Sequence, residues 1–126
     1  MRSILVVLFF SLILPASAFS IPLKITSYVR ETGIIDGATI TSTGYLEFSG
    51  ISHGEIIVKR GGNLLSTGVA KGGISNNGGT VKITGITPVV FANSGTTTIH
   101  GIVDIVKGNG KVIYKSGAVV GGKKIK

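Results

Sequence analysis

The short stretch Thr32-Gly33-Ile34 returns five more times along this chain of 126 residues. The later copies are Ser49-Gly50-Ile51, Thr67-Gly68-Val69, Thr84-Gly85-Ile86, His100-Gly101-Ile102 and Ser116-Gly117-Ala118. Their glycines follow one another at intervals of 17, 18, 17, 16 and 16 residues. A near-constant period indicates a repeat architecture, which a Gly-rich composition alone does not. The predicted structural repeat positions are Gly33, Gly50, Gly68, Gly85, Gly101 and Gly117.

Two other positions of each repeat hold mainly apolar, often β-branched residues. Four residues before the glycine stand Val29, Leu46, Leu64, Val81, Thr97 and Ile113. One residue after it stand Ile34, Ile51, Val69, Ile86, Ile102 and Ala118. Strand alternation puts the first of these columns and the glycine on the same face, so an apolar residue directly after the glycine predicts a slip in the alternation there. A glycine at such a slip is typical of a corner or a bulge.

These features predict an all-β fold, a short β-solenoid of about six coils with a repeat of 16–18 residues. Neighbouring coils then place Leu46 next to Leu64, and Leu64 next to Val81, at about 4.8 Å per coil. The alternative is an antiparallel β-sandwich or meander, which also suits frequent turn residues. We favour the solenoid because a meander does not need the same residue classes at the same offset in every repeat.

Residues 1–18 are predicted to be a secretory signal peptide. Arg2 gives a positive start, an apolar run follows, and Pro15-Ala16-Ser17-Ala18 supplies small residues for cleavage near Ala18. The apolar run is shorter than the roughly 20 residues of a membrane span, and no later segment approaches that length. We therefore expect a mature domain over residues 19–126, secreted to the periplasm or the extracellular space, without a transmembrane span. The chain has no cysteine, so packing and hydrogen bonds must stabilise this domain.

Each coil is expected to contain a second strand and a turn on its far side. Apolar stretches predict second strands at 56–58, 89–91 and 102–106, and glycine-rich and asparagine-rich stretches predict turns at 59–63, 71–79, 92–95 and 107–111. The coil around Gly72 and Gly73 lacks an apolar stretch and is expected to be irregular. The lysine-rich tail from Gly121 to Lys126 is too short to be expected to form a cap of its own.

The basic excess is the clearest functional signal in the sequence. Without residues 1–18 the chain has 12 lysines and arginines against 5 acids, a net charge of +7. Many of these cations fall in or beside the predicted turns, where stacked coils would align several of them along one ridge. Such a ridge attracts anionic polysaccharide, lipid headgroups or other cell-surface polyanions. The candidate binding residues are Lys59, Arg60, Lys71, Lys107, Lys111, Lys115, Lys123 and Lys124.

No pattern of catalytic or metal-binding residues stands out. The acids are scattered through the chain, and Glu31 with Glu47 is the nearest stacked pair for two-carboxylate chemistry. His53 falls one coil from Asp36, but two ligands do not make a closed metal site. Assembling a nucleophilic triad would need Ser52 or Ser116 with His100 and Asp104, without a supporting motif. We expect no enzyme activity, no cofactor and no metal.

The cadence of the six repeats, without large caps, is similar to the β-solenoids of bactofilin-type polymers and of secreted filamentous adhesins. The similarity extends over the repeats in general, and we assign no family from it because bactofilins lack a leader. The sequence thus predicts a secreted, non-enzymatic structural protein of the cell surface or extracellular matrix, assembling with itself end to end through exposed terminal coils. The alternative is a basic, adhesin-like module that binds a polyanion.

Overall fold

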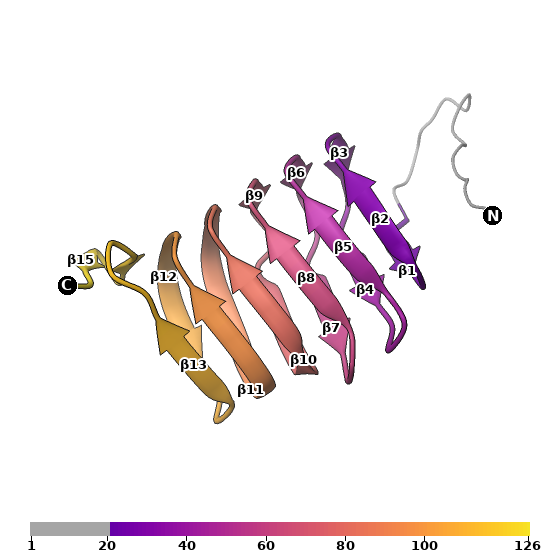
Figure 1. The fold of residues 1–126 in the computed structure, drawn as a ribbon. Helices are drawn as coiled ribbons and strands as arrows, with labels where there is room; N and C mark the ends of the chain where they lie inside the picture. Colours follow the sequence, from indigo (N-terminus) through magenta and orange to yellow (C-terminus); the bar gives the residue numbers. More distant parts are fainter. Residues whose placement is uncertain (1–20) are drawn as a thin grey trace.

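The computed structural model describes residues 21–126, and these residues form a stack of short β-strands that climbs from one end of the molecule to the other (Figure 1). The described residues contain 15 strands and no helix. The predicted signal peptide, residues 1–18, lies outside the described residues.

The strands are short because the chain changes direction several times in each repeat. Most contain two to six residues, and only two are longer. In chain order they are β1 (Leu23–Ile25), β2 (Tyr28–Glu31), β3 (Ile34–Ile35), β4 (Ala38–Ile40), β5 (Tyr45–Phe48), β6 (Ile51–Ser52), β7 (Ile56–Lys59), β8 (Asn63–Ser66), β9 (Val69–Ala70), β10 (Ile74–Ile83), β11 (Ile86–Ile99), β12 (Ile102–Lys107), β13 (Lys111–Tyr114), β14 (Val119–Val120) and β15 (Lys123–Lys124).

Parallel pairing joins these strands into three ladders along the molecule. Ladder A contains β1, β4, β7, the first half of β10, the middle of β11 and the end of β12. Ladder B contains β2, β5, β8, the second half of β10, the end of β11 and β13. Ladder C contains β3, β6, β9, the starts of β11 and β12, and β14.

Each coil takes one segment from each ladder, and about six coils stack on one another. The predicted β-solenoid is therefore confirmed. The antiparallel alternative is wrong, since β14 with β15 is the only antiparallel pair in residues 21–126.

The interior is built from columns of equivalent side chains, as the repeat predicts. Leu46 pairs in register with Leu64, and Leu64 pairs with Val81. All three side chains are buried, with at most 2% of their surface exposed. The predicted stacking of these residues is confirmed, and it gives each coil the same apolar contacts with the coil before and the coil after it.

Glycine is required at the corners from Gly50 to Gly101 because each of these coils approaches the coil before it too closely there for a side chain. The chain bends at Gly33, Gly50, Gly68, Gly85 and Gly101. A Cβ atom on Gly50 would lie 1.8 Å from the carbonyl oxygen of Gly33, and one on Gly85 would lie 2.0 Å from that of Gly68. No real Cβ tolerates such contacts, so the close approach explains the period of the glycines.

Side chains alternate through this corner without interruption, and the predicted slip is wrong. In the second coil Leu46, Phe48, Gly50 and Ser52 are buried, whereas Ile51 between the last two is partly exposed. The glycine absorbs the bend in the backbone without changing which face the next residue takes. The apolar residue after each of these corner glycines consequently points outward.

The coil around Gly72 and Gly73 is more regular than predicted. Ile74 pairs in register with Ile56 of the coil before and Val90 of the coil after. The first half of β10 is therefore the second strand of this coil, which the sequence did not predict. The predicted turn at 71–79 is wrong over most of its length, because strand β10 runs through it with a register shift near Asn77. Asn76 explains how a polar residue fits this core position.

The Asn76 side chain is fully buried and hydrogen-bonded on both of its polar atoms. Its Nδ2 donates to the carbonyl oxygens of Gly79 and Thr96 and to the hydroxyl of Thr97, each at 3.1 Å. Its Oδ1 accepts from the Gly79 N–H at 2.8 Å. A buried amide with these partners is satisfied, and it fixes the bulge between the two halves of β10.

The last coil departs from the repeat, and Gly117 lies outside the corner column. Val119 pairs with Ile102, which places Ala118 opposite Gly101. Gly117 instead lies in a turn with a φ of 95°, and a Cβ atom added to it would have no neighbour within 4 Å. Register therefore gives the final corner to alanine, one residue later than the motif indicates.

The C-terminal tail covers part of this end of the solenoid. Strand β15 pairs antiparallel with β14, and the Ile125 N–H donates to the Ala118 carbonyl oxygen at 2.7 Å. Ile125 is partly buried against the core. The expectation that the tail forms no cap is therefore wrong for ladder C, whose last parallel strand it covers.

Candidate interaction surfaces

The predicted cationic residues are exposed but do not form one ridge. Lys59 and Arg60 lie at the corner between ladders A and B in the third coil, and Lys107 and Lys111 lie at the same corner in the sixth. Three coils at about 4.8 Å place roughly 14 Å between the two pairs. The intervening coils present Asn77 and Ser94, which are stacked in register after Lys59.

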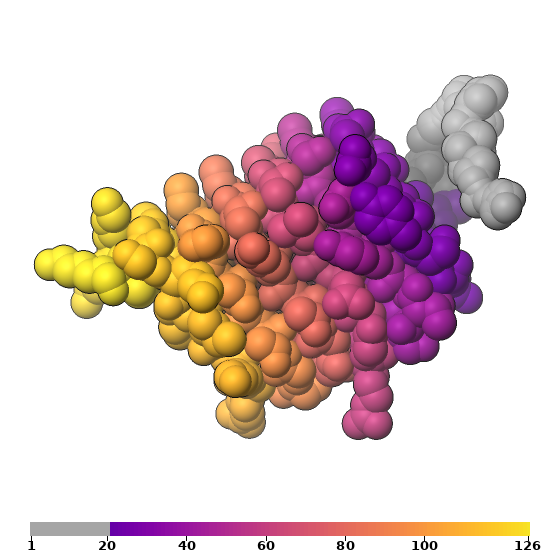
Figure 2. Space-filling model, in the orientation of Figure 1, coloured from indigo at the N-terminus to yellow at the C-terminus, as the bar shows by residue number. Residues whose placement is uncertain are grey.

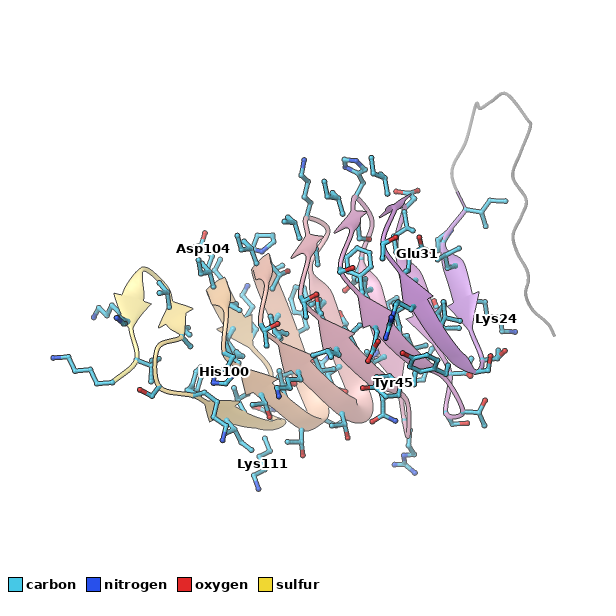
Figure 3. The ribbon with its side chains drawn as sticks, turned by 45° about the horizontal axis from the view of Figure 1, so that its top comes forward. Lys24, Glu31, Tyr45, His100, Asp104 and Lys111 are labelled. Atoms are coloured by element: carbon cyan, nitrogen blue, oxygen red, sulfur yellow. The ribbon has the colours of Figure 1, made fainter. Side chains whose placement is uncertain are left out.

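The other predicted cations lie on different sides of the molecule. Lys71 follows β9 at the corner between ladders C and A, Lys115 follows β13, and Lys123 and Lys124 form β15. Figure 3 shows Lys111 at the rim opposite the one that carries Asp104. The fold therefore does not align all eight cationic residues along a single ridge.

Charge is nevertheless distributed unevenly along the solenoid axis. Residues 21–55 contain two basic and four acidic residues, a net charge of 2 − 4 = −2. Residues 105–126 contain six lysines and no acid, a net charge of +6. All six of these lysines are exposed. The two ends of the described domain thus have opposite sign.

Backbone edges are unpaired at both ends of the described solenoid. Strands β1, β2 and β3 pair with the second coil only. At the other end β13 and the last residues of β12 pair with β11 only, while β14 is covered by β15. Such edges leave N–H and C=O groups free to pair with another strand.

The core columns end in apolar side chains that are only partly covered. At the N-terminal end these are Leu23 in ladder A and Val29 in ladder B. At the C-terminal end the same two columns finish with Val106 and Val112. The apolar interior therefore reaches both ends of the stack.

A hollow of about 370 Å³ lies at the N-terminal end. Ile21, Leu23, Ile34 and Ile35 line it together with Asp36 and His53. Within residues 21–126 no group of three or more metal-ligating side chains comes together, so Asp36 and His53 gain no third ligand. The hollow is a recess lined by both apolar and polar side chains, at the end where the strand edges are free.

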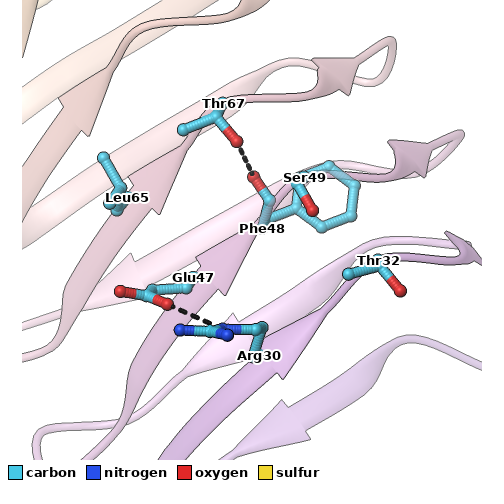
Figure 4. A pocket seen from close by; sticks show the side chains of 7 residues that line it. All are labelled: Arg30, Thr32, Glu47, Phe48, Ser49, Leu65 and Thr67. Carbon is cyan, nitrogen blue, oxygen red and sulfur yellow. Dashed lines mark hydrogen bonds and ion pairs between the residues drawn. The ribbon is translucent and has the colours of Figure 1, made fainter.

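A second hollow of about 380 Å³ runs across the first three coils on ladder B (Figure 4). Its rim carries Arg30 and Glu47 on one side, and its other side carries hydroxyls, including that of Thr67, which donates to the Phe48 carbonyl oxygen at 3.2 Å. Leu65 lies further along the first side. The hollow is a shallow furrow between two outward columns of side chains.

A polar cluster stands beside this furrow. Glu47 Oε1 accepts hydrogen bonds from the Tyr28 hydroxyl at 2.6 Å and from Arg30 Nε at 3.1 Å. These bonds hold the pKa of Glu47 below its ordinary value, the Tyr28 bond contributing most, and the same bond raises the pKa of Tyr28. Tyr45 packs edge-on against Tyr28, with 5.4 Å between the ring centroids. The cluster ties the first two coils together at the surface.

The structure separates the candidate catalytic groups. Glu31 pairs in register with Phe48, and Glu47 pairs with Arg30, so the two carboxylates belong to columns on opposite faces of ladder B. Ser52 is buried and donates to the Gly54 carbonyl oxygen, away from the exposed His100. Neither the candidate carboxylate pair of Glu31 with Glu47 nor a triad through Ser52 is assembled.

The part of the chain that the structure describes has no helix with the length and hydrophobicity that crossing a membrane requires. No protein-family model, curated protein or solved structure matches the chain.

Proposed function

We propose that the mature chain is a secreted, non-enzymatic structural protein of the cell surface or extracellular matrix whose copies stack end to end. The observation that carries the proposal is the state of the two ends. Unpaired strand edges and half-covered apolar columns occur at both, in ladders A and B. A second solenoid can satisfy both needs at once, because its first coil has the shape of the coil that would follow the last.

Continuing the register across the junction brings matching side chains together. Val106 would meet Leu23 of the next copy in ladder A, and Val112 would meet its Val29 in ladder B. The third inward column ends in Tyr114 on one side and Glu31 on the other, a phenol and a carboxylate that are able to hydrogen-bond. Apolar columns would then run without a break from one copy into the next.

Electrostatics favour the same direction of assembly. The end with net charge +6 over residues 105–126 would approach the end with net charge −2 over residues 21–55. Opposite charges steer encounter and disfavour contact between two like ends. The polymer would therefore be polar, with every copy facing the same way.

Full pairing between two copies requires the C-terminal tail to leave its place on ladder C. Strand β15 occupies the place in ladder C where β3 of the next copy would pair. Its displacement exposes a third edge, at the cost of the β14 pairing and of the Ile125 contacts. We expect slow nucleation of the polymer for this reason.

Sedimentation velocity and negative-stain electron microscopy on residues 19–126 test the proposal. The expected result is concentration-dependent growth into unbranched filaments. Val112→Lys should abolish the growth by placing a charge in the junction, whereas Thr80→Lys, on an exposed position of the fourth coil, should leave it unchanged. A strictly monomeric species at high concentration, with no filament on the grid, would contradict it.

The cationic end also supports a second candidate, a basic module that binds anionic polysaccharide or another polyanion. Its supporting observation is the group of six exposed lysines over residues 105–126, a range that contains no acid. The expected sign is retention on immobilised heparin that falls steeply with salt. Absent or salt-indifferent retention would remove this candidate, whatever the outcome of the filament experiment.

A further inference from the structure

One column of apolar side chains, half of them exposed and half partly buried, runs the length of the solenoid. It consists of the residue after each corner, and its members pair in register from coil to coil along ladder C. The exposed fraction is 72% for Ile34, 47% for Ile86 and 48% for Ile102. We call this column the apolar ridge, and its residues are Ile34, Ile51, Val69, Ile86, Ile102 and Val119.

The columns on both sides of the apolar ridge are mostly polar. Two residues before the first five ridge positions stand Thr32, Ser49, Thr67, Thr84 and His100, and the residues two positions after the ridge include the charged side chains of Asp36, Lys71 and Asp104. Threonine in the first of these columns satisfies the β-branched preference of a strand at an exposed site. Strand formation alone therefore does not explain isoleucine and valine in every coil of the ridge.

The apolar ridge stands on a narrow rim. Ladder C contributes only two residues to each coil, with the bend at the corner glycine on one side. Figure 2 shows separate projections along the upper rim of the molecule, stepping from the indigo end towards the orange coils. Knobs at a regular spacing of about 4.8 Å fit between the knobs of an identical column.

We infer that the apolar ridge joins two copies of the chain side by side, ridge against ridge, so that stacked solenoids associate laterally. The inference rests on the proposed end-to-end stacking and adds a second contact to it. Identical columns with the same repeat interdigitate at every coil and exclude water between them. A partner with another spacing would lose the match within a few coils.

The area of the apolar ridge decides whether single copies or only filaments can associate through it. Three of the six side chains are about half exposed or more and three are partly buried, so together they offer at most roughly 330 Å² per copy if a full aliphatic side chain offers about 60–120 Å². A stable interface needs about 800 Å² per partner. Two single copies therefore do not hold together, whereas filaments repeat the contact along their length and gain by multivalency.

Electron microscopy and low-speed pelleting of assembled protein test the inference. Wild-type filaments should lie in pairs or bundles, and the double variant Ile86→Thr with Ile102→Thr should give single filaments with a several-fold loss of pelleting. Threonine keeps the β-branched shape that a strand prefers. Ile57→Thr is the matched control, because Ile57 is partly exposed, lies in an inner coil between Thr39 and Ser75, and is outside the apolar ridge, and it should bundle as the wild type does.

Four results would overturn the inference. If the double variant still forms bundles, the apolar ridge is not their cause. If wild-type filaments always stay single, there is no lateral contact, but the proposed end-to-end assembly is unaffected. Absence of any filament removes the proposed function and this inference together. If the double variant fails to fold, Ile86→Thr alone, in an inner coil and 47% exposed, replaces it. Unassembled wild-type chain that pellets with uncharged lipid vesicles would assign the ridge to a lipid surface instead.

Discussion

Replacing Gly85 by alanine tests why the repeat has its period. The new Cβ would lie 2.0 Å from the Gly68 carbonyl oxygen and 2.7 Å from the Thr67 carbonyl carbon. Relief requires the two coils to separate by about 1 Å, which strains the bond from the Ile86 N–H to that same Gly68 oxygen, now 3.0 Å long. Overpacking of this kind costs about 1–3 kcal/mol, and a weakened buried hydrogen bond adds about 1–3 kcal/mol.

We therefore expect Gly85→Ala to lower the free energy of unfolding by about 2–6 kcal/mol, which corresponds to a fall in Tm of about 8 °C or more. Urea denaturation followed by far-ultraviolet circular dichroism measures the loss. Gly117→Ala is the matched control, because Gly117 has a φ of 95° and open space around it. Its cost should be limited to the left-handed backbone, about 1–2 kcal/mol. Equal losses in the two variants, or a smaller loss for Gly85→Ala, would refute the close approach of coils as the reason for glycine.

Three further predictions concern the tail, the surface cluster and the core. Truncation after Val120 should speed assembly at high salt, where the tail lysines no longer contribute attraction, and light scattering that is unchanged or slower would contradict this. Tyr28→Phe should raise the pKa of Glu47, measured as the midpoint of its carboxyl NMR titration, because the hydrogen bond from the Tyr28 hydroxyl lowers that pKa. The stability from this bond is present above the unfolded-state pKa of Glu47 and is lost as the pH falls through the folded-state pKa. An unchanged midpoint would count against the cluster. Asn76→Leu should cost about 1–3 kcal/mol in urea denaturation by leaving the Gly79 N–H unpaired, whereas the exposed Asn77→Ala should cost about 0.5 kcal/mol. Similar losses in the two variants would show that the buried amide is not needed.

The stacked columns could be predicted from the sequence because a solenoid core demands the same residue class at the same offset. Leu46, Leu64 and Val81 follow that rule, and the structure pairs them in register. The direction of the residue after the corner glycine could not be predicted in the same way. An apolar residue such as Ile86 is normally read as buried, and only the geometry of the bend reveals that alternation continues through Gly85.

Two other differences have local causes. Asn76 in an Asn-Asn-Gly-Gly run has the composition of a turn, but its amide finds four partners inside the core. The final coil gains residues between Tyr114 and Ala118, so the glycine motif and the corner separate by one position. Neither the hydrogen bonds of Asn76 nor the longer last coil can be recognised from the types of residue in these segments, so the sequence pattern does not predict them.

The candidate surfaces were less predictable than the fold. Sequence places Lys59 and Lys107 beside turns, but the side of the solenoid on which a turn lies depends on the number of residues in each segment of the coil. The coils between these lysines present Asn77 and Ser94 at the corresponding positions. The charge difference between residues 21–55 and residues 105–126 can be counted from the sequence. Only the stacking direction shows that these two segments lie at opposite ends of the solenoid.

Disulfide trapping tests end-to-end stacking most directly, because the natural chain contains no cysteine. Tyr28 and Lys111 occupy the first and last positions of one outward column of ladder B, five coil intervals or about 24 Å apart. A bond within one copy of the Tyr28→Cys, Lys111→Cys double variant is therefore excluded by distance, while the stacked register brings Cys at 111 beside Cys at 28 of the next copy. Mild oxidation should give a ladder of covalent multimers on a non-reducing gel, and the pair Leu65→Cys, Lys111→Cys should not. Oxidised protein that remains monomeric would contradict the proposed assembly.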